Sequence, residues 1–125
     1  MNYDFSEEAE KLFEAIRSIA ATAPAEEDLA GATVDTISAA LREMLKALAE
    51  TGYLQDGRDD DTPEGAVNQM AAMETLAGQA RSLFLAVEMS TRVLGRALAR
   101  WGTGAAQEQW REGLLQGQWI GALAL

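Results

Sequence analysis

The chain has 125 residues and a formal net charge of −10, and it contains neither histidine nor cysteine. The lack of cysteine excludes disulfides and thiolate chemistry, and the lack of histidine removes the commonest general base and metal ligand. Any chemistry would have to come from carboxylates or a bound cofactor. Hydrophobic residues make up 48% of the chain, which is enough for one packed core in a domain of this size.

The net negative charge also limits the kinds of partner that the chain can bind. Binding to nucleic acid or to an anionic membrane needs clustered positive charge, so we expect neither partner. The first 14 residues are acidic and amphipathic and do not form a signal peptide, which would have a basic and then an apolar segment. No apolar run approaches the roughly 20 residues of a membrane span. The sequence therefore predicts a cytoplasmic protein without membrane contact.

The N-terminal part of the chain predicts two helices and a short connection. Ser6 is a capping residue, and a helical apolar pattern follows it until Pro24, which ends the helix. Residues 25–33 are acidic and contain a glycine, so we expect a connection with at most one helical turn. A second helix is predicted for about residues 35–50, and Gly52 is suited to the left-handed position after its end.

An acidic segment and a third helix follow. Residues 55–61 hold four aspartates, but the spacing of a calcium loop is missing, so a solvated loop is favoured over a metal site. Thr62 and Pro63 predict the cap and first residue of a helix over about residues 63–77, which Gly78 is expected to end. Two methionines of this helix are interpreted as core-filling residues, Met70 and Met73.

The segment from Leu83 to Trp101 carries the strongest helical pattern in the chain. Its apolar side chains cover most of the circumference and leave little more than a polar stripe through Glu88, Arg92, Arg96 and Arg100. We therefore predict a central helix with other helices against most of its sides. The arginines repeat every fourth residue and are interpreted as an ion-paired surface rather than a phosphate or CoA contact, because Glu88 lies one turn before Arg92.

The C-terminal part predicts a short helix and a strand. Thr103 lies between two glycines and can cap a fifth helix that ends at Gly117. Residues 119–125 are apolar and uncharged, which is typical of the start of a buried strand. Three tryptophans are expected to anchor the junction between helices and strand rather than to line a ligand site: Trp101, Trp110 and Trp119. The predicted fold is all-α, an up-and-down bundle of about five helices in residues 1–118 with a strand beginning in residues 119–125.

Several of these segments resemble the flavin-dependent acyl-CoA dehydrogenases. Residues 97–125, ALARWGTGAAQEQWREGLLQGQWIGALAL, are similar to the link between the N-terminal helical domain and the middle β-domain of that family. Residues 47–54, ALAETGYL, resemble a helix end and turn of the family, and residues 73–77, METLA, stand where it has a Glu-Glu-Leu-Ala run. Phe5-Ser6-Glu7-Glu8 matches the usual opening. The resemblance spans nearly the whole chain in the right order.

The resemblance implies the N-terminal helical part of an enzyme that uses FAD to oxidise the Cα–Cβ bond of acyl-CoA thioesters. It also implies that the backbone around Leu123 and Leu125 lies beside the flavin ring, as cofactor-binding residues. Residues 93–98 would lie in the region that borders the acyl-chain pocket. The sequence stops before the Thr-Glu-Pro flavin contacts, the β-domain and the catalytic glutamate of the family. We therefore expect this chain alone to have no catalytic residue, to be inactive and not to hold FAD.

Two functional classes follow. In the first, the chain is part of such a flavoenzyme and other polypeptide completes the site. In the second, it is a non-catalytic helical interaction or oligomerisation module that has the same fold. Both predict a partner, either a second copy that associates through residues 119–125 or a completing dehydrogenase chain, because an apolar strand edge seeks a partner.

Overall fold

The computed structural model describes residues 4–55, 62–122 and 124. These residues form helices and connections without a strand, so the fold is all-α as predicted. None of the described helices is both long enough and apolar enough to span a membrane. In chain order the helices are α1 (Glu7–Ala21), α2 (Glu26–Ala30), α3 (Val34–Glu50), α4 (Pro63–Gln79), α5 (Arg81–Glu88), the π-helical turn η1 (Met89–Val93), α6 (Leu94–Trp101) and α7 (Gly104–Leu115).

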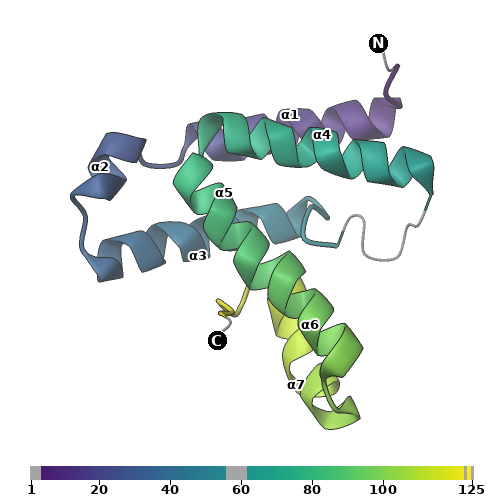
Figure 1. The fold of residues 1–125 in the computed structure, drawn as a ribbon. Coiled ribbons are helices and arrows are strands. Elements are labelled where there is room, and N and C mark those ends of the chain that lie inside the picture. The colour runs from purple at the N-terminus through teal and green to yellow at the C-terminus, as the bar shows by residue number, and fades with distance from the viewer. Residues whose placement is uncertain (1–3, 56–61, 123, 125) are drawn as a thin grey trace.

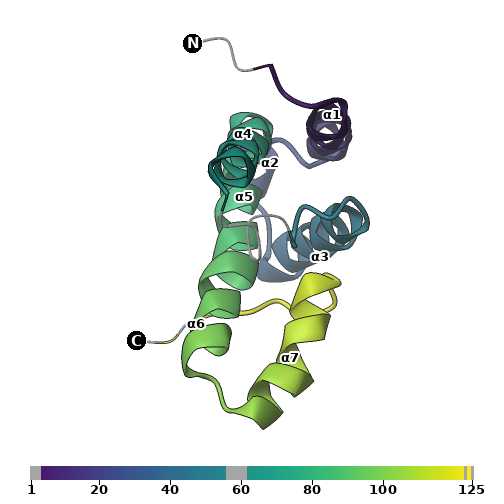
Figure 2. The ribbon, with the colours of Figure 1, turned by 90° about the vertical axis from the view of Figure 1, so that its right-hand side faces the viewer.

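Three helices form a compact group from which an arm extends. α1 and α4 lie side by side and run in the same direction, while α3 runs the opposite way below them (Figure 1). Figure 2 shows these three helices nearly end-on, at the corners of a triangle. α5, η1 and α6 form one continuous helix that crosses the group at α5 and then leaves it. α7 folds back along α6, so α6 and α7 make the arm.

Hydroxyl caps start four of the helices. In each case the side chain accepts a hydrogen bond from the backbone N–H three residues later, which satisfies a donor that the helix leaves open. The caps and their donors are Ser6 with Ala9, Thr33 with Thr36, Thr62 with Gly65, and Thr103 with Ala106, at 3.1–3.3 Å. The caps predicted at Ser6, Thr62 and Thr103 are confirmed, and so is the left-handed conformation of Gly52. Gly117, predicted to end the fifth helix, lies just after α7 and also has a positive φ.

The core lies between α1, α3, α4 and α5. Its fully buried large side chains include Ile16, Leu45, Leu48, Tyr53, Leu54, Leu76, Leu83 and Val87. Burial of each aliphatic side chain stabilises the fold by roughly 1.5–3 kcal/mol. Met73 packs against this core, but Met70 is 70% exposed, so its predicted core position is wrong. Met70 lies two residues before the buried Ala72, and a step of two residues leads to the opposite side of a helix.

The predicted break at Gly78 is wrong. α4 continues through Gly78 to Gln79, and the chain bends at Ala80, which has φ −136° and ψ 61°. Gly78 lies on an exposed surface where its low helix propensity costs only about 1 kcal/mol, which packing elsewhere in α4 offsets. Ala80 is buried, and it connects both helices because its N–H donates to the Leu76 carbonyl and its carbonyl accepts from the Phe84 N–H.

The predicted strand is also not found in the described part of the tail. Residues 119–122 are irregular, and 124 is not in a strand either. A strand needs a neighbouring strand for its ladder of hydrogen bonds, and the described chain offers only helices. The backbone N–H of Gly121 instead donates to the Ser90 hydroxyl at 2.7 Å.

The central helix is enclosed at one end only. Leu83 and Val87 in α5 are buried, as predicted, but Gly95 is the one buried residue of α6, and Trp101 is 76% exposed. The reason is the crossing geometry. α5 lies against α3 and α4, whereas α6 has passed beyond them and has α7 along one side (Figure 2).

Candidate functional site

A row of exposed apolar side chains follows the free side of the central helix. Leu85, Met89 and Val93 are four residues apart, so they share one face. They are 63%, 40% and 39% exposed, while Leu83 and Val87 on the opposite side are buried. A helix with one face in the core normally presents polar residues on the other. We call these three residues the outer stripe, and contiguous exposed apolar surface of this kind marks a binding site.

The stripe continues into a shallow groove on α6. The groove has a volume of about 350 Å³, and its lining includes Val93, Ala97 and Trp101. The guanidinium groups of Arg96 and Arg100 flank it, and that of Arg100 lies 5.5 Å from the centre of the Trp101 ring. Within the described chain neither arginine has an ion-pair partner, so the predicted ion-paired surface is wrong for these two of the three arginines.

A buried polar cluster lies beneath the stripe and consists of Tyr53, Glu88 and Arg92. The Tyr53 hydroxyl donates to Glu88 Oε1 at 2.6 Å, and Arg92 Nε lies 2.9 Å from Glu88 Oε2. The Arg92 guanidinium also donates two long bonds, 3.4 and 3.5 Å, to the Tyr53 carbonyl and lies 4.7 Å from the centre of its ring. The Glu88–Arg92 pair is therefore confirmed, but it lies in the interior and not in a solvated surface.

The geometry of the cluster suits a structural ion pair rather than a site of proton transfer. Arg92 Nε does not point its hydrogen at Glu88 Oε2, so their contact is one of charges and not a hydrogen bond. Burial, and then the nearby Glu88 carboxylate, raise the pKa of the Tyr53 phenol far above its usual range. Glu88 is the one buried carboxylate among the described residues; its Oε1 accepts from the Tyr53 hydroxyl, and its Oε2 faces the charge of Arg92 without a hydrogen bond. It is thus not free to act as a general base.

Sequence reasoning missed this cluster as a unit. The spacing of Glu88 and Arg92 was a signal, because two opposite charges one turn apart in an otherwise apolar stretch must either face solvent or pair inside. No local pattern predicts that Tyr53, 35 residues earlier, completes the pair.

The tail crosses from α7 to η1. Trp119 packs edge-on against Trp110, with 5.6 Å between ring centres, and its ring lies where a side chain at Gly113 would be. Trp110 and Trp119 therefore meet as expected, although both stay partly exposed, whereas Trp101 is separate from them and the predicted three-residue anchor is wrong. Leu123 and Leu125 lie outside the described residues, so their predicted flavin contact stays a prediction.

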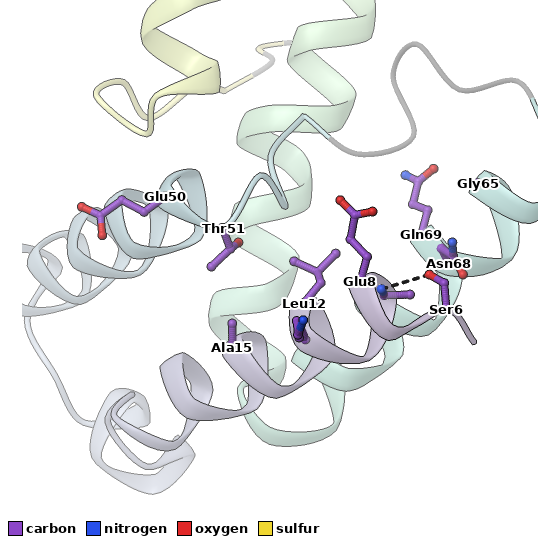
Figure 3. A pocket seen from close by; sticks show the side chains of 11 residues that line it. Ser6, Glu8, Leu12, Ala15, Glu50, Thr51, Gly65, Asn68 and Gln69 are labelled. Carbon is purple, nitrogen blue, oxygen red and sulfur yellow. Dashed lines mark hydrogen bonds between the residues drawn. The ribbon is translucent and has the colours of Figure 1, made fainter. Parts of the chain in front are cut away.

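A cavity larger than the groove on α6 lies among the three helices of the compact group. It is a groove of about 550 Å³ between the start of α1, the end of α3 and the start of α4, and Figure 3 shows the side chains that line it. Leu12 and Ala15 form apolar wall, and Glu8 and Glu50 are exposed at its edges. Lys11 also lines it and pairs with Glu7 at 2.6 Å. Open, solvated charges of this kind do not make an acid–base pair, so we find no catalytic arrangement there.

The described residues also form no candidate metal site. Across residues 4–55 and 62–122 no three acidic side chains are grouped so that they could hold an ion. The aspartate-rich segment falls mostly on residues 56–61, which lie outside the described residues.

Comparisons of the chain with protein-family models, with curated proteins and with solved structures find no match.

Proposed function

We propose that this chain is the N-terminal helical part of an acyl-CoA dehydrogenase-like flavoenzyme, and that its outer stripe forms one wall of the acyl-chain pocket. Other polypeptide would supply the FAD contacts and the catalytic base. The proposal rests on the sequence resemblance of residues 97–125 and on one structural observation. That observation is the apolar surface of Leu85, Met89 and Val93 on the free side of a helix whose other side is core.

An acyl chain and the outer stripe match in chemistry. Aliphatic and thioether side chains offer an alkyl chain only dispersion contacts and release of water, worth roughly 0.8 kcal/mol per buried CH₂ group. The two exposed arginines at the α6 end, Arg96 and Arg100, add positive charge beside this apolar surface. A surface of this composition suits a ligand with an apolar chain and an anionic end.

We do not expect the described residues to form a flavin site on their own. Their buried polar side chains are Glu88, Ser90, Thr91 and Arg92, and contacts inside the protein engage them. A bound flavin would accept the electrons of the oxidation, but we assign no group of this chain to hold it. We expect the purified chain to be colourless and to gain no flavin on titration.

The test reads the gene beyond the codon of Leu125 and uses the protein encoded by this chain together with that continuation. We expect the gene to continue into a Thr-Glu-Pro segment and the protein made from it to bind one FAD per chain and to lose flavin absorbance when an acyl-CoA is added. In that protein, Met89→Glu should raise the KM for acyl-CoA strongly because it places a carboxylate against the alkyl chain. Met70→Glu is the control, since Met70 is also an exposed methionine but lies on α4, away from the outer stripe.

Two results would contradict the proposal. One is that the protein with its continuation after Leu125 binds neither flavin nor acyl-CoA. The other is an equal effect of the two glutamate substitutions, which would show that the outer stripe does not touch the substrate.

A second candidate function is the non-catalytic interaction module. The exposed ring of Trp101, flanked by the unpaired Arg96 and Arg100, favours it, because tryptophan and arginine dominate protein interfaces. If Trp101→Ala abolishes binding to a protein partner while flavin and acyl-CoA never bind, this candidate replaces the first.

A further inference from the structure

The surfaces at the two ends of the central helix carry opposite charge. The short acidic helix α2 contacts the start of α5, because the Glu26 carboxylate accepts hydrogen bonds from the backbone N–H and the hydroxyl of Ser82. Glu27 and Asp28 follow on α2 and are exposed. Arg81 is the one basic residue of α2 and α5. The surface around the start of α5 is therefore acidic overall.

The other end of the helix is basic. No acidic residue occurs between Glu88 and Glu108, and Arg96 and Arg100 are exposed on α6 without an ion-pair partner in the described chain. The outer stripe lies between the two ends. The free side of the central helix thus has an acidic start, an apolar middle and a basic end.

A surface of this kind is complementary to itself when two copies lie antiparallel. With Met89 of one copy beside Val93 of the second, Leu85 comes beside Ala97 of the second copy, because each lies four residues farther from that contact. Leu85 is 63% exposed, and Ala97 lines the groove on α6. A large side chain of each copy therefore meets a groove with a small residue in the other, which is how facing helices pack closely.

The charged ends match in the same arrangement. Ser82 lies seven residues before Met89, and Arg100 lies seven residues after Val93, about 10 Å along the helix in both cases. Arg100 of the second copy therefore comes to the end of α5 where Ser82 holds Glu26. The two-fold symmetry of the pair forms this contact twice.

We propose that a second copy of this chain covers the outer stripe, with the central helices antiparallel and Glu26 of each copy beside Arg100 of the other. One helix face from each copy makes a small interface, so the association is weak and reversible. The pairing goes beyond the proposed function and does not need it. An acyl chain on the outer stripe and a second copy would exclude each other.

Analytical ultracentrifugation of the 125-residue chain, over concentrations up to the high micromolar range, tests the pairing. We expect a reversible equilibrium between monomer and dimer. Met89→Glu should weaken it by at least about tenfold, because it brings a carboxylate from each copy into the apolar middle of the interface. Val34→Glu is the control and should leave it unchanged, since Val34 is 78% exposed but lies at the start of α3, away from the outer stripe.

A mixing experiment tests the antiparallel arrangement. Arg100→Glu alone brings two carboxylates together at both charged contacts, and Glu26→Arg alone brings two guanidinium groups together, so each variant should associate severalfold more weakly than the unsubstituted chain. Mixed in equal amounts, the two variants can form a pair in which one contact is unchanged and the other has its charges reversed. The mixture should therefore regain most of the lost association. Mixing would not repair a loss of stability in either variant.

Three results would overturn the proposal. One is a monomer at every concentration. Another is an equal effect of Met89→Glu and Val34→Glu, which would show that the copies associate through another surface, such as the tail. The third is a mixture that associates no more strongly than its two variants.

If Met89→Glu does not fold, Met89→Ala takes its place. Alanine keeps the helix and removes most of the apolar contact, so the dimer should weaken severalfold, and an unchanged equilibrium would overturn the proposal. None of these measurements uses flavin or acyl-CoA, so a negative result leaves the proposed function untouched.

Discussion

In α5, Leu83 and Val87 are enclosed by neighbouring helices, whereas in α6 Leu94 and Leu98 are only half-buried and Trp101 is open to solvent. The two segments are ends of one helix, and both carry apolar side chains at helical spacing. The difference comes from their surroundings, since α3 and α4 flank α5 and the arm has only α7. An apolar pattern thus shows that a helix will form but not how many sides of it will be covered.

The largest expected effect concerns the join between the two segments. Arg92→Met should lower the free energy of unfolding by about 3–5 kcal/mol, because Glu88 would be left as a buried charge without its partner. Arg96→Met, on the exposed side, should change it by no more than about 0.5 kcal/mol. Urea unfolding of both variants measures the difference. Equal losses would show that the Glu88–Arg92 pair is not held in the interior.

The second largest expected effect is a difference in the stability lost when a leucine of α5 or of α6 is replaced by alanine. Leu83→Ala creates a cavity in the core and should cost about 3 kcal/mol. Leu98→Ala removes a half-buried side chain and should cost about 1 kcal/mol. Denaturant midpoints of the two variants give the comparison. A loss at Leu98 as large as at Leu83 would indicate that a partner covers the arm in solution.

Glycine substitutions test how the arm is attached to the bundle. Gly52 and Gly117 both have positive φ, so alanine at either should cost about 1–2 kcal/mol of backbone strain. At Gly117 a Cβ would also lie 2.4 Å from the Leu45 carbonyl oxygen, and this overlap should add about 1–3 kcal/mol. Hydrogen exchange should rise in α6 and α7 of Gly117→Ala and not in α5. Uniform exchange along the helix would contradict a separately attached arm.

The smallest effect lies at the start of α5 and depends on pH. The N–H of Ser82 donates to Glu26 at 3.0 Å and its hydroxyl donates to the same carboxylate, so these bonds lower the pKa of Glu26 below its ordinary 4.5. The carboxylate form is favoured in the folded state, so its contribution is present above pH 4.5 and is lost as the pH falls through the folded pKa.

Ser82→Ala should therefore be slightly less stable than the unsubstituted protein at neutral pH and indistinguishable from it in strong acid. Thermal melts across this range measure the gap. Ser18→Ala is the control, because its hydroxyl bonds to a backbone carbonyl and the difference it makes should not vary with pH. If Ser82→Ala remained less stable than the unsubstituted protein in strong acid, the difference in stability would not come from the bonds to Glu26.

Features that depend on local chemistry could be predicted from the sequence. The caps at Ser6, Thr62 and Thr103 and the left-handed Gly52 were predicted correctly because a residue and its own backbone decide them. The apolar pattern likewise identified the helices and the all-α class. These predictions needed no knowledge of which helices would touch.

Features that depend on tertiary arrangement could not be predicted. The outer stripe was hidden because apolar residues cover almost the whole circumference of the central helix, and periodicity cannot then tell the inner from the outer face. The π-turn has no sequence signature, and the burial of Arg92 within it could not be foreseen. The Tyr53 contact joins residues 35 positions apart. The candidate site was thus the part of the molecule least visible in the sequence.

The pairing of α1 with α4 has a consequence for synthesis of the chain. The buried face of α1, which includes Phe13 and Ile16, cannot close until α4 has left the ribosome, 58 residues after the end of α1. At a translation rate of about 5–20 residues per second, the nascent segment shows its apolar face for several seconds. The glutamates on its other faces, Glu7, Glu8, Glu10 and Glu14, repel other emerging chains during that interval.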